Sequence, residues 1–201
     1  MKNIVDAFNS DRIGLIIFSS EAFVQSPLTY DQGALHMFID VLGTNLVPNA
    51  GTDFGPPLRL AREKLASDES NVEGPKSKII ILISDGEDFG EDTGEEARNI
   101  TDQGITLFTL GVGTREGSNI RTPYGIKTDR NGKQVVTKLD SRGLRSLAVE
   151  TGGQYFEIND NKNDTERLIN TISGIEGELR DTRKVDVSAN KYYYFLALGR
   201  L

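Results

Sequence analysis

Lys78 to Asp88 reads KIIILISDGED, and this stretch decides the fold of the chain. Five consecutive apolar residues, four of them isoleucine, favour a strand over a helix. No polar residue alternates with them, so we expect both faces of the strand to be covered, as in the central strand of a parallel sheet. The run stops at Ser84-Asp85-Gly86, a turn sequence with oxygen-bearing side chains. Ligands of open α/β sheets bind beyond the carboxyl ends of the strands, which makes Asp85 the first candidate functional residue.

The composition excludes several classes of function. The chain has 201 residues, a formal net charge of −7 and no cysteine. This acidic balance argues against nucleic-acid binding, which needs a basic surface. The lack of cysteine excludes thiol catalysis and cysteine-ligated zinc. The chain also contains no run of about 20 apolar residues, the length that would cross a bilayer.

Strand and helix patterns alternate along the sequence. Apolar runs predict strands, and apolar residues spaced three and four apart predict helices. The predicted strands are 12–20, 22–28, 78–84, 105–112 and 154–158, and the predicted helices are 2–9, 31–42, 53–67, 95–103, 141–150 and one that begins at Asp164 or Thr165. This order indicates a doubly wound, mostly parallel α/β sheet with helices on both faces, a Rossmann-like architecture. Asn131-Gly132 predicts a type I′ turn, and hence an inserted β-hairpin near 119–140.

Four segments carry a family resemblance. They are Phe18-Ser19-Ser20, Gly51-Thr52-Asp53 at the start of a helix, Ile81 to Gly86, and Gly104-Ile105 followed by Gly111-Val112-Gly113. In this order and spacing the chain resembles a von Willebrand factor A (VWA) domain. The predicted hairpin and the segment from Thr151 to Phe156 resemble one branch in particular, the bacterial aerotolerance (Bat-type) membrane-anchored VWA proteins.

The resemblance implies a metal-binding site. VWA domains hold a divalent cation, usually Mg²⁺, in a metal-ion-dependent adhesion site (MIDAS) built from three loops. The residues of this chain that match two of these loops are Thr52 and Asp85. Mg²⁺ prefers such oxygen ligands, and in this family its open position accepts a carboxylate from a protein partner. The first loop of the family, Asp-x-Ser-x-Ser, has no match in this sequence, so we expect weak metal binding or none.

The resemblance also implies a strand that the sequence does not supply. In the family, the strand before the Asp-x-Ser-x-Ser loop lies between the strands predicted at 12–20 and 78–84. We therefore expect an N-terminally truncated fragment in which the gap is filled by residues 192–198, by a partner chain or by rearranged pairing. A homodimer or a strand swap would satisfy the backbone groups of both edges.

The resemblance predicts two regions. Residues 1–182 form the VWA-like domain, and residues 183–201 form a tail that leads towards a membrane segment. Bat-type proteins carry such a segment, so the implied setting is an inner-membrane tether with the domain in the periplasm. Tyr192 to Leu198 is apolar and aromatic, and it fits either the start of that segment or a core strand.

Each candidate site residue also has a purely structural interpretation. Asp85 suits a turn, Thr52 or Asp53 suits the N-cap of a helix that contains Pro56 and Pro57, and the acidic run from Glu87 to Glu96 suits a solvated loop. The sequence predicts a non-enzymatic interaction domain that binds protein partners. A structural module without metal is the alternative. A small hydrolase or nucleotide-binding enzyme is less favoured, because the only histidine is His36 and no P-loop or nucleophile elbow occurs.

Overall fold

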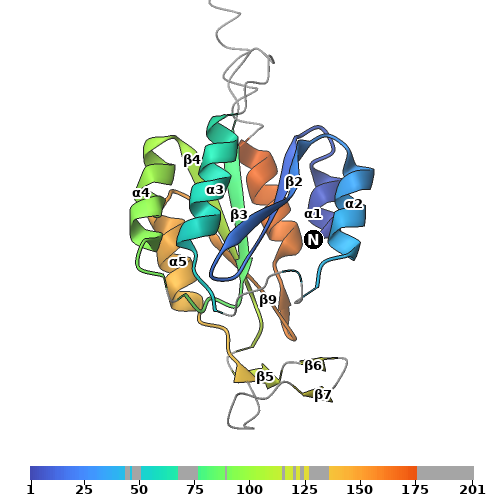
Figure 1. Ribbon diagram of the computed structural model, residues 1–201, viewed down its shortest axis with the longest axis vertical. Helices are drawn as coiled ribbons and strands as arrows, with labels where there is room; N and C mark the ends of the chain where they lie inside the picture. The colour runs from blue at the N-terminus through green and yellow to red at the C-terminus, as the bar shows by residue number, and fades with distance from the viewer. Residues whose placement is uncertain are drawn as a thin grey trace, which may run out of the picture.

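The computed structural model (Figure 1) describes residues 1–43, 46, 51–67, 77–88, 90–114, 116–119, 121–122, 125–126 and 136–175. The predicted turn at Asn131-Gly132 and the predicted tail at 183–201 lie outside the described residues. No helix in the described part of the chain is both long and apolar enough to cross a membrane.

A four-stranded sheet forms the centre of the molecule. Its strands are β3 (Lys78–Ser84), β4 (Ile105–Val112), β9 (Tyr155–Asn159) and β10 (Lys162–Asn163). Their spatial order is β10-β9-β4-β3, with β3, β4 and β9 parallel and β10 antiparallel to β9. The predicted mostly parallel α/β architecture is therefore confirmed. The sequence did not predict β10, because its two residues are both polar and show no strand pattern.

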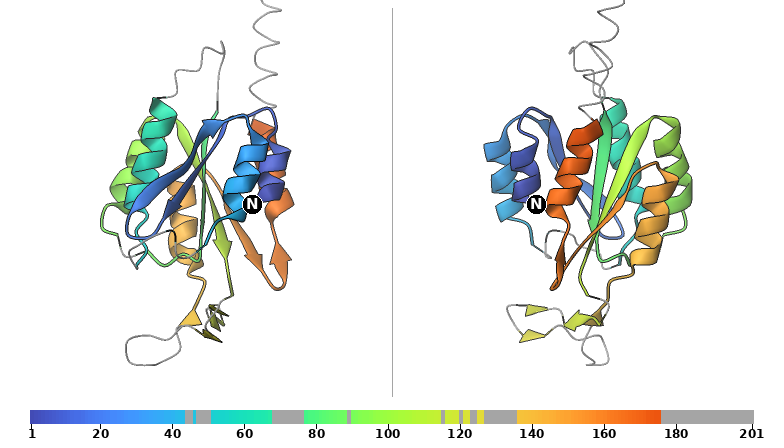
Figure 2. Two further views of the ribbon diagram at one scale, coloured as in Figure 1. Left: turned by 45° about the vertical axis from the view of Figure 1, so that its right-hand side comes forward. Right: turned by 180° about the vertical axis from the view of Figure 1, so that it is seen from behind.

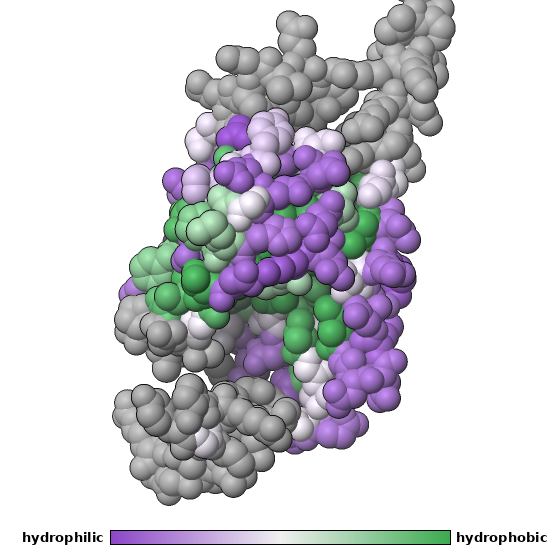
Figure 3. All heavy atoms as spheres, turned by 90° about the vertical axis from the view of Figure 1, so that its right-hand side faces the viewer, coloured by the Kyte–Doolittle hydropathy of each residue, from purple (hydrophilic) through white to green (hydrophobic). Residues whose placement is uncertain are grey.

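Helices cover both faces of this sheet (Figure 2). On one side lie α3 (Gly55–Ala66), α4 (Thr93–Asp102) and α5 (Ser141–Glu150), and on the other lie α1 (Lys2–Ala7) and the helix at 165–175. The side chains of β4 alternate between the two cores: Ile105 and Leu107 pack with α3–α5, whereas Phe108 and Leu110 pack with α1 and the last helix. A further helix, α2 (Gln32–Asp40), lies beside α1, on a face where hydrophilic and hydrophobic side chains both reach the surface (Figure 3).

The first two strands form a sheet of their own. β1 (Ile13–Phe18) and β2 (Ala22–Thr29) pair antiparallel around a turn in which Ser19 N donates to Glu21 O. Among the described residues neither strand pairs with β3, so β3 is an edge strand of the four-stranded sheet. Of the β3 residues only Leu82 is fully buried. The sequence predicted a central strand covered on both faces. The side chains of β3 do pack against both cores, Ile80 and Leu82 on one face and Ile79, Ile81 and Ile83 on the other, but the central position in the sheet belongs to β4. A further strand between β1 and β3 stays a prediction.

Two helices begin differently from the prediction. The N-cap of α3 is Phe54, and neither Thr52 nor Asp53 occupies that position, although Asp53 Oδ1 accepts a hydrogen bond from Gly55 N at 2.8 Å. The N-cap of α5 is Asp140 rather than Ser141, because the Asp140 side chain accepts from Arg142 N at 3.0 Å. In α5 the capping aspartate stands one position earlier than predicted, and in α3 Asp53 bonds the first turn from one position before the N-cap.

Short antiparallel pairs follow β4 in the region of the predicted insertion, but Ile126 pairs with Arg121 and not across the predicted Asn131-Gly132 turn. β5 (Ser118–Asn119) pairs with β8 (Val136–Thr137), and β6 (Arg121–Thr122) pairs with β7 (Gly125–Ile126). They lie beyond the carboxyl end of β4, away from the helical layers (Figure 1). The insertion is therefore an extension at the same end of the sheet as Asp85.

Candidate functional site

The turn after β3 is fixed against the start of α5. Asp140 N donates to Asp85 O at 2.9 Å, and Gly86 has φ +90°, a conformation that residues with a side chain rarely adopt. A Cβ at Gly86 would collide with the carbonyl oxygen of Asp140. The glycine is therefore required both by its backbone conformation and by this close approach, and it holds Asp85 at the end of the strand.

The carboxylate of Asp85 has only weak internal contacts. Its Oδ1 lies 3.4 Å from the donor Glu87 N and 3.5 Å from Ser84 Oγ, both at the long limit of hydrogen bonding. No ion pair with Asp85 occurs among the described residues. Its oxygens therefore keep most of their capacity to accept from a ligand.

The loop at residues 51–54 joins two other loops at this edge. Asp53 N donates to Ser19 O at 3.0 Å in the β1–β2 turn, and Phe54 N donates to Asp88 Oδ1 at 3.1 Å in the loop after β3. A Cβ at Gly90 would collide with the Asp53 carboxylate. The loop that carries Thr52 thus meets the loop that follows Asp85, as the resemblance implied. Thr52 is half-buried, and its hydroxyl makes no hydrogen bond within the described part of the chain.

Asp88 is the residue at this edge that sequence reasoning missed. Its carboxylate accepts from Phe54 N and Gly90 N, each at 3.1 Å, and from Thr93 Oγ1 at 2.7 Å. The sequence placed it in an acidic run and assigned that run to a solvated loop. The signal that identifies it is the spacing Asp85-x-x-Asp88 after a buried strand, since a second aspartate there can hold the neighbouring loop by its backbone.

The chemistry of these groups fits a hard cation in kind. Thr52 and Asp85 offer a hydroxyl and a carboxylate, the oxygen donors that Mg²⁺ prefers. The Ser19 hydroxyl beside the 51–54 loop is buried and has no partner among the described residues. The described part of the chain contains no group of three His, Cys, Asp or Glu side chains placed to hold a metal. The oxygen donors of Thr52 and Asp85 are therefore of the type that binds a hard cation, but two donors are fewer than a closed metal site has.

An ion-pair cluster braces the helices that begin at this edge. Glu96 of α4 is almost fully buried and accepts from Arg59 Nε at 3.0 Å and from Arg62 Nε at 3.1 Å, both on α3. Burial alone would raise the pKa of Glu96, but the bonds from the two guanidinium groups outweigh it, so this pKa lies below its ordinary value. Arg59 also bonds Asp92, immediately before α4, at 3.3 Å. The starts of α3 and α4 are thereby held together.

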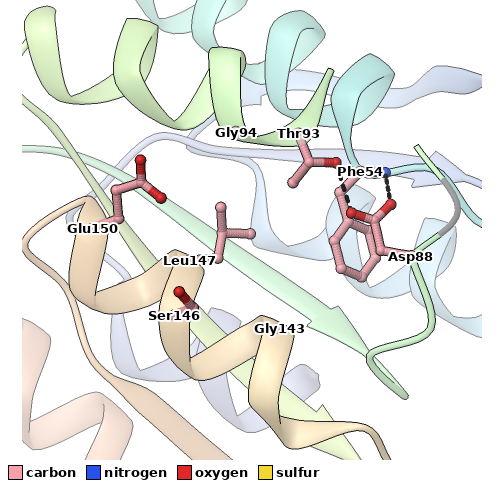
Figure 4. A pocket seen from close by; sticks show the side chains of 8 residues that line it. All are labelled: Phe54, Asp88, Thr93, Gly94, Gly143, Ser146, Leu147 and Glu150. Atoms are coloured by element: carbon pink, nitrogen blue, oxygen red, sulfur yellow. Dashed lines mark hydrogen bonds between the residues drawn. The ribbon is translucent and has the colours of Figure 1, made fainter. Parts of the chain in front are cut away.

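A cavity of about 180 Å³ opens between α4 and α5, beside this edge (Figure 4). Phe54 and Asp88, the two residues that connect the loops, line one end of it. Glu150 of α5 lines the other end.

Comparisons with known proteins match this architecture to one family. Residues 1–170 match the von Willebrand factor type A domain. BatB from Bacteroides thetaiotaomicron, a conserved hypothetical protein, superposes with a TM-score of 0.77 at 27% identity, over 90% of this chain and 84% of that chain. An aerotolerance-related membrane protein from Bacteroides fragilis superposes with a TM-score of 0.74 at 28% identity, over 85% of this chain and 82% of that chain.

A more distant structure shows the fold with metal. Proximal thread matrix protein 1 from the mussel byssus, with a zinc-occupied MIDAS motif, has a TM-score of 0.58 at 20% identity and covers 84% of this chain and 38% of its own. At this identity the likeness concerns the fold alone. No curated protein matches the chain.

Proposed function

Because the chain belongs to the von Willebrand factor type A family, we propose that it is a non-enzymatic module that binds a protein partner at the carboxyl edge of its sheet. One observation carries this proposal: the hydrogen bond from Phe54 N to Asp88 Oδ1, which joins the loop of Thr52 to the loop that follows Asp85. Domains of this family commonly mediate protein interactions, and some contain a MIDAS motif.

We further propose that Thr52 and Asp85 are ligands of a divalent cation, Mg²⁺ in the first place. When bound, Mg²⁺ would offer an open position for a carboxylate of the partner. The contribution of this chain is to hold one hydroxyl and one weakly engaged carboxylate on adjoining loops. Two protein ligands alone give weak binding, and an Asp-x-Ser-x-Ser loop would complete the set.

The names of the relatives support a membrane setting. One of these relatives is an aerotolerance-related membrane protein, and the sequence of this chain resembles the same Bat-type branch. We propose that the domain acts as a membrane-tethered module, held at the inner membrane and facing the periplasm.

The separation of β1–β2 from β3 supports an added strand between them. Among the described residues the five apolar residues of β3 pair with β4 alone, and four of them are partly exposed. A strand from a second copy of the chain, from residues 192–198 or from a partner would satisfy the exposed backbone edge. Light scattering with size-exclusion chromatography tests the homodimer, which predicts twice the mass of 22.1 kDa.

Calorimetric titration with Mg²⁺ and Mn²⁺ tests the cation proposal. We expect weak, saturable binding that Asp85→Asn reduces about tenfold or more, with a smaller loss in Thr52→Val. The matched control is Asp160→Asn, which changes an exposed carboxylate of the β9–β10 turn. A longer chain with an Asp-x-Ser-x-Ser segment upstream should bind more tightly.

Two outcomes would contradict the proposed function. Absence of binding in both the present and the longer chain would favour a structural module without metal. Turnover of a nucleotide or an ester by the purified protein would overturn the assignment as a non-enzymatic module.

A further inference from the structure

The cavity between α4 and α5 is a groove with apolar walls and acidic ends. Phe54 and Leu147, both members of the hydrophobic core, reach its surface with exposed fractions of only 2% and 5%. Figure 4 shows Asp88 at one end and Glu150 at the other, with Leu147 between them. At a rise of about 1.5 Å per residue, the α5 segment that lines the groove, from Gly143 to Glu150, is about 10 Å long. The shape suits an extended side chain rather than a compact one.

Two helical glycines keep the groove open. Gly94 lies in the first turn of α4 and Gly143 in the first turn of α5, and both line the cavity. Neither has a positive φ, and a Cβ at either position would meet no atom within 4 Å. Glycine inside a helix is less stable than alanine, and here neither the backbone conformation nor a close approach requires it. In this they differ from Gly86. What the two glycines provide is open space between the helices.

The charge of the groove is unbalanced. Among the described residues, no lysine, arginine or histidine lines it. Asp88 is already engaged by three donors, whereas the carboxylate of Glu150 has no ion pair or hydrogen bond within the described residues. A cationic group at that end would find an unengaged carboxylate, on a chain whose net charge is −7.

We propose that this groove receives a lysine side chain of the protein partner. The methylene stem packs on Phe54 and Leu147, and the ammonium group pairs with Glu150. Lysine combines these two properties, since it buries its stem against apolar surface while the charged end stays accessible to water. The proposal rests on the proposed function for one point, that the occupant belongs to a protein. It adds a contact that is separate from the cation ligands and that selects for a basic residue.

The test uses n-butylammonium as a probe, with amide chemical shifts followed by NMR. We expect saturable shifts at the amides of Gly94 and Gly143. Glu150→Gln should weaken the binding about two- to five-fold, the range of an exposed ion pair. Gly143→Leu should abolish it by filling the groove. The neutral isostere n-butanol should bind more weakly than n-butylammonium.

Matched controls come from the same chain. Glu63→Gln changes an exposed carboxylate of α3, and Gly174→Leu changes an exposed glycine of the last helix that also has open space around it. Both should leave the shifts unchanged. If Gly143→Leu fails to fold, Gly143→Ala replaces it and should reduce the binding, because its methyl group narrows the groove.

Three results would overturn the proposal. They are the absence of saturable shifts, equal binding of n-butanol and n-butylammonium, and equal losses in Gly143→Leu and Gly174→Leu. Calorimetry with Mn²⁺ on Gly143→Leu separates this proposal from the cation site, since the groove variant should leave metal affinity unchanged.

Discussion

The backbone N–H of Phe54 donates to Asp88 Oδ1 at 3.1 Å, and this bond joins the loop before α3 to the loop after β3. Asp88 also accepts from Gly90 N and Thr93 Oγ1, so a single carboxylate organises both loops. Replacement of Asp88 by alanine would leave the N–H of Phe54, which is buried, without a partner. We expect Asp88→Ala to lower the free energy of unfolding by about 2–3 kcal/mol, measured by urea denaturation.

The exposed Asp160→Ala is the comparison for this variant and should change the free energy by less than about 0.5 kcal/mol. Equal stabilities of the two variants would show that Asp88 does not hold the loops.

The buried ion-pair cluster predicts a loss of stability in acid. The pKa of Glu96 in the folded protein lies below its ordinary value, because the bonds from Arg59 and Arg62 outweigh the effect of burial. A depressed pKa contributes stability above the unfolded value of about 4.3 and loses it as the pH falls through the folded value. The free energy of unfolding, followed by urea denaturation between about pH 6 and pH 3, should therefore fall more steeply in the parent protein than in Glu96→Gln.

At neutral pH, Glu96→Gln itself should be less stable than the parent by about 2–4 kcal/mol, since two guanidinium groups lose a buried partner while Arg59 stays half-exposed. Glu63→Gln on the exposed side of α3 should have almost no effect. If the free energy of unfolding did not change with pH over this range in either the parent or Glu96→Gln, this account would be contradicted.

Substitutions at two glycines with positive φ distinguish the energetic cost of backbone strain from that of a steric collision. Gly86 has φ +90° and no room for a Cβ, whereas Gly104 has φ +66° and open space around it. Gly104→Ala should lower the free energy of unfolding by about 1–2 kcal/mol through backbone strain alone. Gly86→Ala should lower it by about 2–5 kcal/mol, because the collision with Asp140 O adds to the strain. Thermal or urea denaturation measures both, and equal losses would mean that the Asp140 contact relaxes freely.

Tyr155 predicts a loss of stability in alkali. Its side chain is buried and its Oη donates to Glu157 Oε2 at 2.9 Å; burial first, and this bond second, raise the pKa of Tyr155 to about 12. Because the unfolded chain ionises this tyrosine near pH 10, the folded state loses stability as the pH rises from about 10 towards 12. In Tyr155→Phe the fall in the free energy of unfolding between about pH 9 and pH 11.5 should be smaller by about 2 kcal/mol. An unchanged slope would contradict the assignment.

Much of the fold follows from local patterns in the sequence. The isoleucine run of β3, the apolar run of β4 and the periodic apolar residues of α5 each specify one element. What the sequence could not supply was the context of pairing. The side chains of β3 pack against both cores, as its composition predicted, yet among the described residues β3 pairs along one edge only, because pairing with a neighbour depends on segments far away in the chain. β10 has only two polar residues and exists because it folds back on β9.

The candidate site was predicted in part. Asp85 was selected from its position after a strand and Thr52 from the family resemblance, and the loops that carry them adjoin in the structure. Their role as metal ligands stays a prediction. Asp88 and the groove between α4 and α5 depend on how the helices pack, so no pattern within a single segment identifies them.

The two-sheet arrangement also divides the molecule into parts that differ in how firmly they are tied together. Among the described residues, one backbone hydrogen bond, from Asp53 N to Ser19 O, links the β1–β2 hairpin to the rest. The amides of β1 and β2 can then exchange with solvent through opening of the hairpin alone, whereas those of β4 require the whole sheet to open. The edge proposed to meet a partner would be assembled from a part held by the four-stranded sheet and a hairpin that can open separately.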